Sequence, residues 1–328
     1  MTLDEVARVA GVSRATVSRV VNGVASVDEG IRRTVELAVT ATGYRPNQAA
    51  RSLVTRRAGS IALVLPEESR MLGDPFFVEI VTGVTSVVRA GGVHLVLMMA
   101  GVGTSEHVLA DLRQGRLDGV ILVYTHRDDP LPAWLVEAHL PVVMSGRPDR
   151  PLLISYVDVN QIAGSAMAAE HLVARGCRQV ATICGPADST AGQDRLSGFL
   201  AAMRAHGRSD VTVAEGDFTR DSGAAAMQQL LTDRPDLDGV FIASDLMAQG
   251  ALAVLRRHGR RVPDDVAVVG FDDSSAAMAC DPPLTTVRQP VEEMAAEMAR
   301  LLLRQIEGSG VPTSSVVFEP SLVVRGSA

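Results

Sequence analysis

The sequence predicts an all-α helix-turn-helix head followed by an α/β body of two Rossmann-like lobes. Helix-capping patterns and apolar residues at helical spacing fill the first 57 residues, and from Ser60 onward short apolar strands alternate with amphipathic helices. The net charge of the chain changes sign at the same place. The first 57 residues carry nine arginines and five acidic residues, a net charge of +4; because the whole chain carries −7, the remainder carries −11. A basic head on an acidic body places phosphate binding at the amino-terminal end.

The head begins with two short helices separated by a tight turn. Thr2 followed by Glu5 fits a capping box, in which a hydroxyl and a carboxylate satisfy free amides at a helix start. Gly11 can adopt the left-handed conformation that ends this helix, and Ser13 is a suitable N-cap for the next. Val17 and the valines at positions 20 and 21 are expected to face inward. This spacing predicts a helix-turn-helix.

The outward face of the second helix is the candidate DNA-reading surface. A recognition helix contacts bases with its amino-terminal residues, and arginine bonds guanine through two donors, so the candidates for base contacts are Arg14, Ala15 and Arg19. The polar side chains beside them are candidates for phosphate contacts, which fix register; these are Ser13, Thr16, Ser18 and Asn22. A solvated amphipathic hairpin would show the same face, and the segment that follows argues against that alternative.

A third helix and a proline-led segment complete the head. Ser26 with Glu29 fits a second capping box, and Gly43 fits a C-cap. The residues expected on the buried side of this helix are Ile31, Val35, Leu37 and Ala38. Residues 46–56 are interpreted as a hinge helix that is too short to be stable alone. We therefore expect it to fold only against DNA and a second copy of itself.

The body is interpreted as two successive α/β halves. In the first half, strands are predicted over 61–65, 95–99, 120–124 and 141–144, and helices over 76–90, 105–114 and 131–138. In the second half, strands are predicted over 180–184, 211–215, 240–243 and 266–271, and helices over 161–175, 195–206, 222–231 and 247–257. Short apolar strands joined by helices indicate parallel sheets covered on both faces, and ligands of such folds lie beyond the carboxyl ends of the strands.

Composition argues against several kinds of chemistry. All 31 basic side chains are arginine, so the chain has neither a P-loop lysine nor a Schiff-base lysine. The three cysteines and seven histidines are dispersed, and no HExxH, CxxC or GxSxG motif occurs. We therefore expect no catalytic residue, metal site or cofactor. The absence of a signal peptide and of an apolar stretch of about 18 residues leads us to expect a cytoplasmic, nucleoid-associated protein.

Several motifs together resemble the lactose-repressor (LacI) family of bacterial transcription regulators. In the head they are SRATVSRVVN at 13–22, GYRPN at 43–47 and AARSL at 49–53. In the body, in the family's order, they are AAEHLVARG (168–176), GP (185–186), RLSGF (195–199), SDLMAQGAL (244–252), VVGFDD (268–273) and PPLTTVRQP (282–290). The resemblance covers essentially the whole chain and implies a body like a periplasmic sugar-binding protein, with two lobes that close around a small ligand.

The expected division is a head with its hinge over residues 1–57 and a ligand-binding, dimerising body over 58–328. We assign residues 60–158 with 285–291 to one lobe and residues 159–284 with 292–328 to the other. The resemblance also implies roles in the hinge. Leu53 occupies the position of a leucine that wedges between base pairs at the operator centre. Further DNA-contact candidates are Tyr44, Asn47, Ala50 and Arg51.

The resemblance implies an effector site between the lobes. Arg195 matches an arginine that bonds ligand hydroxyls or carboxylates, and Asp272 matches an acid that accepts from ligand hydroxyls. A lobe-stabilising ion pair and a helix cap are the respective alternatives. Phe76 and Phe218 match aromatic positions that pack on the ligand, with ordinary core packing as the alternative. The remaining candidates are Phe77, Ser145, Arg147, Asn160, Ser189 and Ser244.

Asn160 and Ser244 stand where relatives usually carry aspartate and asparagine, which leaves the ligand class open. A sugar or sugar phosphate is expected first, and a nucleobase or another metabolite stays open.

The whole pattern predicts a homodimeric regulator, expected to be a repressor, that binds a palindromic operator under effector control. Whether the effector releases or tightens DNA binding stays open. A transport-class solute-binding protein would carry an export signal and lack the basic head. A sugar-binding or sugar-modifying protein with a DNA-binding head is the other alternative; an enzyme of that kind would show a phosphate cradle or a base–nucleophile pair.

Overall fold

The computed structural model describes residues 2–21, 24, 26–44, 57–66, 73–100, 105–123, 127, 129–308 and 312–328. Contacts divide the chain into two compact units, Met1–Gly59 and Ser60–Ala328. In the described part of the chain, no helix is both long enough and apolar enough to cross a membrane.

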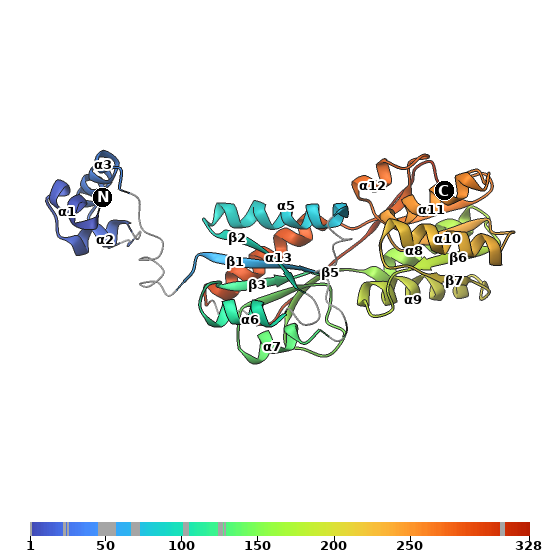
Figure 1. The fold of residues 1–328 in the computed structure, drawn as a ribbon, viewed down its shortest axis with the longest axis horizontal. Helices are drawn as coiled ribbons and strands as arrows, with labels where there is room; N and C mark the ends of the chain where they lie inside the picture. The colour runs from blue at the N-terminus through green and yellow to red at the C-terminus, as the bar shows by residue number, and fades with distance from the viewer. Residues whose placement is uncertain are drawn as a thin grey trace. The chain divides into compact units, whose positions relative to one another are not determined.

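Three helices make up the first unit: α1 (Leu3–Ala10), α2 (Arg14–Val21) and α3 (Glu29–Thr42), drawn in blue in Figure 1. The predicted capping box at the start of α1 is present: the Thr2 amide donates to Glu5 Oε2 at 2.7 Å, and the Glu5 amide donates to Thr2 Oγ1 at 3.4 Å. Gly11 ends α1 with a left-handed φ of 65°. The three helices enclose one small apolar core, formed by Val6, Ala7, Val17, Val20, Val35, Ala38 and Tyr44.

The third helix differs from the expectation at its start and on its surface. Asp28, not Ser26, is the N-cap, and its Oδ1 accepts from the amides of residues 30 and 31 at 2.9 and 3.2 Å. The prediction of a capping box with Glu29 is therefore wrong, because a carboxylate nearer the first turn takes those amides. Ile31 and Leu37 are 39% and 67% exposed, so they are not part of the buried side.

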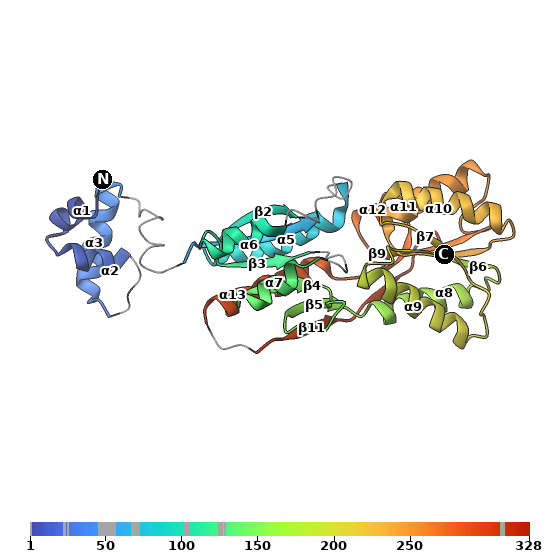
Figure 2. The ribbon, with the colours of Figure 1, turned by 60° about the horizontal axis from the view of Figure 1, so that its bottom comes forward.

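The first lobe of the second unit is a six-stranded parallel sheet between two helix layers (Figures 1 and 2). Its strands, in spatial order, are β2 (His94–Ala100), β1 (Ser60–Pro66), β3 (Gly119–Leu122), β4 (Val142–Ser145), β5 (Ser155–Val159) and β11 (Ser315–Phe318). Helices α5 (Pro75–Ala90) and α13 (Val291–Ile306) cover one face, and α6 (Ser105–Arg113) and α7 (Leu131–Glu137) cover the other. Alternate residues of β1 enter the two cores, which explains its unbroken apolar run.

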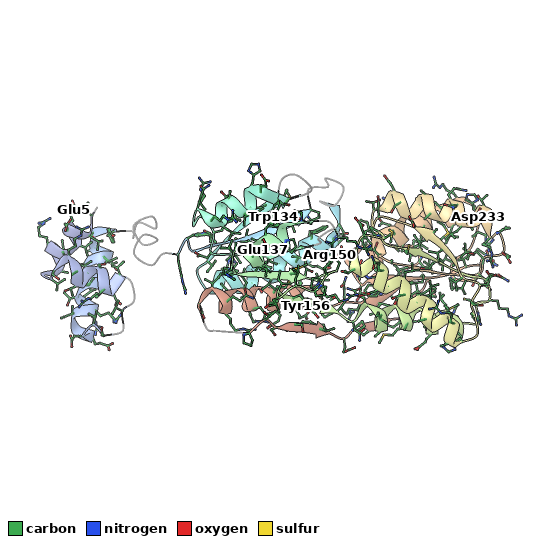
Figure 3. All side chains as sticks on the ribbon, turned by 90° about the horizontal axis from the view of Figure 1, so that it is seen from below. Glu5, Trp134, Glu137, Arg150, Tyr156 and Asp233 are labelled. Atoms are coloured by element: carbon green, nitrogen blue, oxygen red, sulfur yellow. The ribbon has the colours of Figure 1, made fainter. Side chains whose placement is uncertain are left out.

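The second lobe repeats this plan. Its strands, in spatial order, are β7 (Thr212–Glu215), β6 (Val180–Cys184), β8 (Gly239–Ile242), β9 (Ala267–Asp272), β10 (Thr285–Arg288) and β12 (Ser321–Val323). All neighbouring pairs are parallel except β10 with β12. Its helices are α8 (Gln161–Ala174), α9 (Thr190–Ala205), α10 (Arg220–Asp233), α11 (Asp245–Arg257) and the short α12 (Ser275–Met278). Figure 3 shows Asp233, the last residue of α10, on this lobe and Tyr156 of β5 on the first.

The two lobes exchange their carboxy-terminal segments, which corrects the predicted lobe boundaries. Residues 285–288 form β10 of the second lobe, where we expected the first lobe. Conversely, α13 and β11 belong to the first lobe, although we assigned 292–328 to the second; β12 alone of these elements lies where expected. Figure 1 shows α13 in red beside α5 in cyan, far apart in the sequence.

The physical reason is the apolar face of α13. Val291, Met294, Ala295, Met298, Ala299, Leu301 and Leu302 are buried in the core of the first lobe. Gly83 of α5 allows this approach, since a Cβ at that position would overlap the backbone carbonyl of Glu292. The chain therefore crosses between lobes three times: from β5 to α8, from β10 to α13 and from β11 to β12.

Candidate functional site

One face of α2 is exposed and the opposite face is buried. Arg14, Ala15 and Arg19 are exposed, while Val17 and Val20 lie in the head core. Ser13 caps the helix as expected: its Oγ accepts from the Thr16 amide at 3.1 Å and bonds the Thr16 hydroxyl at 2.8 Å. The predicted recognition face is therefore a continuous exposed surface, with Ser18 half-buried beside it.

The other DNA-contact candidates fall into two groups. Tyr44 is 8% exposed and packs in the head core, so its ring is part of the core and not of the exposed face. Asn22 and the hinge candidates lie outside the described residues; the latter are Asn47, Ala50, Arg51 and Leu53.

Two adjoining cavities, each of about 80 Å³, lie where strand ends of the two lobes meet. They share four lining residues: Phe76, Ala191, Arg195 and Gln289. The first is otherwise lined by Ser145, Gly146, Arg147, Asp158, Gln161, Ser189, Thr190 and Met294, and the second by Asp74, Phe77, Phe218, Ser244 and Asp272. We call the two together the cleft. Nine of the ten effector candidates line it.

The tenth candidate, Asn160, lines neither cavity. Its Oδ1 accepts from the Ala163 amide at 3.1 Å as the N-cap of α8. Ser189 and Ser244 line the cleft and also cap helices, since their hydroxyls accept from the amides of Gly192 at 3.4 Å and Met247 at 3.3 Å. Each serine therefore has a structural task at the cleft wall.

Arg195 lies at the centre of the cleft and is 5% exposed. Its NH1 donates to the Ala243 carbonyl at 2.5 Å and to Asp272 Oδ1 at 3.2 Å, and its Nε donates to Gln161 Oε1 at 2.8 Å. The guanidinium also stacks over the Phe271 ring, with 3.7 Å between its central carbon and the ring centroid. The ion pair with Asp272 lies within the second lobe, as the lobe-stabilising alternative requires, and it fixes the direction of the guanidinium.

Two non-glycine residues of the cleft wall have left-handed backbone conformations. Asp272 has a φ of 116° and Phe218 a φ of 65°. Such conformations cost free energy and persist where surrounding contacts hold them. Gln289 Nε2 donates to Asp272 Oδ1 at 2.7 Å, and the adjacent Asp273 pairs with Arg288 at 2.6 Å. These contacts hold the Asp272 carboxyl at the cavity wall.

Carboxyl groups dominate the electrostatics of the cleft. Among the described lining residues, the cations are Arg147 and Arg195, and the acids are Asp74, Asp158 and Asp272. Burial raises the pKa of all three acids, to about 7 for Asp272, where Arg195 opposes the shift. Both cations are engaged by carboxylates, Arg195 by Asp272 and Arg147 by Asp194. The cleft therefore offers hydrogen-bonding groups rather than free positive charge.

Sequence reasoning missed the Thr190 hydroxyl and four acid or amide residues of the cleft wall: Asp74, Asp158, Gln161 and Gln289. Asp74 caps α5 by accepting from the Phe76 amide at 3.0 Å. The other three lie at the end of a strand or in the crossovers after β5 and β10. Recognising those crossovers was the missing signal, because polar residues at the ends of parallel strands face the crevice.

Glu79 of α5 provides a test of this acidic surrounding. Burial, followed by the charges of Asp272 and Glu292, raises its pKa from 4.5 to about 7. Glu79 therefore contributes its full stabilisation of the folded state below about pH 4.5. This contribution is lost as the pH rises through about 7. We expect Glu79→Gln, which mimics the protonated acid, to melt higher than the parent at about pH 8 and to show a smaller difference between about pH 5 and 8.

Thermal melting of the full chain at the two pH values checks this expectation. Glu106 is exposed, so Glu106→Gln is the matched control. We expect this control to show the same difference in melting temperature between the two pH values as the parent. An equal pH difference in Glu79→Gln and the parent would contradict the acidic surrounding.

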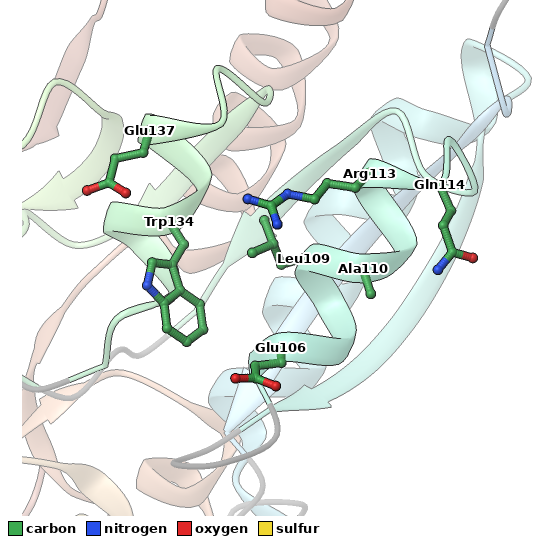
Figure 4. Close-up of a pocket in the computed structure, with 7 residues that line it drawn as sticks. All are labelled: Glu106, Leu109, Ala110, Arg113, Gln114, Trp134 and Glu137. Carbon is green, nitrogen blue, oxygen red and sulfur yellow. The ribbon is translucent and has the colours of Figure 1, made fainter.

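A second hollow, of about 570 Å³, lies on the first lobe between α6 and α7 (Figure 4). Its wall includes Trp134 and Glu137 of α7, and Glu106 and Arg113 of α6. Figure 4 shows these side chains lying around an open groove, and none of the residues that line it lines the cleft. The described residues hold no group of three acid, histidine or cysteine side chains placed to bind a metal ion.

Comparison with known proteins matches both units. Residues 2–47 match the family described as bacterial regulatory proteins, lacI family, and residues 169–328 match the periplasmic binding protein-like domain. The HTH-type transcriptional regulator CelR of Thermobifida fusca is 47% identical over 332 residues, covering 99% of this chain and 98% of that protein. The HTH-type transcriptional repressor CytR of Escherichia coli (strain K12) is 34% identical, covering 99% and 96%.

Solved structures of transcriptional regulators are similar to this chain over its whole length. A transcriptional regulator CelR–cellobiose complex is 44% identical with a TM-score of 0.79, and covers 100% of both chains. The lac repressor dimer bound to operator and the anti-inducer ONPF is 28% identical with a TM-score of 0.86, covering 100% of this chain and 98% of the other. The relatives named here are transcriptional regulators, not enzymes.

Proposed function

Because the chain belongs to the lacI family of bacterial regulatory proteins, we propose that it is a repressor that binds a near-palindromic operator as a homodimer and changes its DNA affinity when a sugar occupies the cleft. The observation that carries this proposal is the Arg195–Asp272 pair, fixed between phenylalanine rings where the lobes meet. Hydrogen-bonding groups beside apolar rings suit a ligand with hydroxyls and apolar faces.

The DNA-reading role rests on the exposed face of α2. Arg14, Ala15 and Arg19 would contact bases in the major groove, and the hydroxyls around them would contact phosphates. We propose a head of residues 1–57, with its hinge over 46–56, and a body of 58–328. In a homodimer, two heads would bind two half-sites related by the two-fold axis of the protein.

The homodimer proposal is supported by an unpaired apolar edge. β2 is an edge strand of the first sheet, and its Val96, Leu97 and Met99 are 39%, 54% and 40% exposed. Val78 of α5 is 63% exposed. Apolar side chains along an edge strand favour pairing with another chain, and a second copy provides a self-complementary partner.

Charge supports a neutral sugar over a sugar phosphate as the effector. A phosphate group needs arginine donors that are free to bond it, whereas both cations lining the described cleft already bond carboxylates. When ionised, these buried acids would repel a phosphate, and in the protonated form that their raised pKa values favour they can donate to a hydroxyl group. The similar CelR was solved with cellobiose, a disaccharide without charge.

A thermal-shift series on the full chain tests the effector class. Cellobiose and other neutral disaccharides are compared with glucose and with glucose 6-phosphate at equal concentrations. A ligand that binds the folded state alone, at about a hundred times its dissociation constant, adds about 2.7 kcal/mol of stability. We expect a neutral sugar to raise the melting temperature and the phosphate to leave it unchanged. A shift with glucose 6-phosphate alone would contradict the neutral-sugar proposal.

A further inference from the structure

Arg147 and Asp194 form an ion pair that joins the two lobes at the edge of the cleft. Arg147 follows β4 of the first lobe, and Asp194 lies in α9 of the second. The arginine Nε donates to Asp194 Oδ2 at 3.1 Å, and its NH2 donates to Oδ1 at 2.7 Å and to Oδ2 at 2.9 Å. This bidentate arrangement is the strong form of an arginine–carboxylate contact. Its hydrogen bonds raise the pKa of the Arg147 guanidinium.

Further hydrogen bonds connect the Arg147 backbone to both lobes. The Thr190 hydroxyl of the second lobe donates to the Arg147 carbonyl at 3.4 Å, and the Arg147 amide donates to Asp158 Oδ2 at 3.1 Å. Asp158 Oδ1 in turn accepts from Gln161 Nε2 at 3.0 Å, and Gln161 holds Arg195. A continuous chain of hydrogen bonds therefore runs from the inter-lobe ion pair, through the β5–α8 crossover, to the centre of the cleft.

The geometry does not suit Arg147 as a direct effector contact, the role expected from the sequence. Its guanidinium is directed at Asp194, which lines neither cavity. The Asp194 side chain is 14% exposed and the Arg147 side chain 46%. The bidentate geometry of the pair, and not a contact with the effector, is therefore what favours the closed arrangement of the lobes.

We propose that the Arg147–Asp194 pair is an inter-lobe latch that sets effector affinity through lobe closure, with the Arg147 guanidinium bonded to Asp194 and not to the effector. Its effect on affinity rests on the proposed sugar-binding function, whereas its effect on lobe closure does not. An effector held between two lobes binds the closed form, so its apparent dissociation constant rises as the closed fraction falls. Breaking the latch lowers that fraction and thereby weakens binding.

Lobe closure is measured first, without any ligand. Glu137→Cys on α7 and Ala201→Cys on α9 are exposed positions on opposite lobes for spin labels, and the native cysteines are buried. The full-length labelled chain is diluted with an excess of unlabelled chain, so that most of the dimers that contain label carry one labelled copy. We expect Asp194→Asn to shift the distance distribution to longer and broader values. We expect the charge swap Arg147→Asp with Asp194→Arg to return it toward that of the parent.

Affinity is measured second, with cellobiose as the probe. Asp194→Asn should raise the apparent dissociation constant about two- to fivefold, the range for loss of one partly exposed ion pair. Asp111→Asn breaks the Arg116 pair within the first lobe, whose shortest distance is 2.8 Å, and is the matched control for both measurements.

Each outcome decides one proposal. Unchanged label distances in Asp194→Asn, or an unchanged dissociation constant in a chain that binds cellobiose, would overturn the latch. Failure of the parent chain to bind cellobiose and the other neutral sugars would instead contradict the proposed effector, while the label distances would still decide whether the latch exists.

Discussion

Arg195→Met is expected to lose effector binding by more than about a hundredfold and to destabilise the body by about 3–5 kcal/mol, the cost of removing one partner of a buried ion pair. The arginine is 5% exposed and bonds Gln161, the Ala243 carbonyl and Asp272. Its removal leaves the Asp272 carboxyl without its cation. Urea unfolding and sugar titration of the full chain measure the two effects.

A second variant separates folding from binding. Asp272→Asn should keep the fold, since asparagine tolerates the left-handed φ of 116° at this position. The double variant with Arg195→Met removes both charges, and we expect it to recover much of the lost stability while effector binding stays lost. If the double variant bound the sugar as the parent does, Arg195 and Asp272 would not be effector contacts.

Gly250→Ala is expected to destabilise the second lobe by about 3 kcal/mol or more, because overpacking here meets backbone that cannot rotate away. A Cβ on Gly250 of α11 would overlap the Arg220 carbonyl at the start of α10. In the same contact, a Cβ on Gly223 would overlap the Met247 carbonyl. The two helices therefore pack backbone to backbone.

Thermal and urea unfolding of the full chain measure this cost. The control is Gly91→Ala, whose Cβ would meet its neighbours at 3.6–4.0 Å in an exposed turn and should change stability by less than about 0.5 kcal/mol. Equal stability of the two variants would contradict the close helix contact.

Local signals predicted the head and most of the body. Caps and left-handed glycines are set by a few neighbouring residues, so Thr2, Glu5 and Gly11 could be placed from sequence. Where two caps compete, the pattern is ambiguous: Asp28 took the amides that Ser26 was expected to cap. Helical spacing also overestimated burial at Leu37, because a three-helix head buries a narrow face.

Nine of the ten effector candidates line one cleft because strand ends of parallel sheets meet at one crevice. Arg195, Phe218 and Asp272 follow three different strands of the second lobe and line the same cavity. What sequence could not give was the exchange of carboxy-terminal segments between lobes. Strand pairing such as that of β11 with β5 joins residues far apart in the chain, and apolar patterning alone does not identify the partner. Gln161 and Gln289, which lie in or beside the crossovers, were missed for that reason.

The central claim is that occupation of the cleft changes how the head binds DNA. The most direct test is fluorescence anisotropy of the full chain on an operator selected from random DNA, with and without the sugar that raises its melting temperature. We predict that the sugar changes operator affinity by at least about fivefold, the lower end of ordinary allosteric coupling. Asp272→Asn should bind the operator without this response. An operator affinity that saturating sugar leaves unchanged, or that is no stronger than affinity for bulk competitor DNA, would contradict the account.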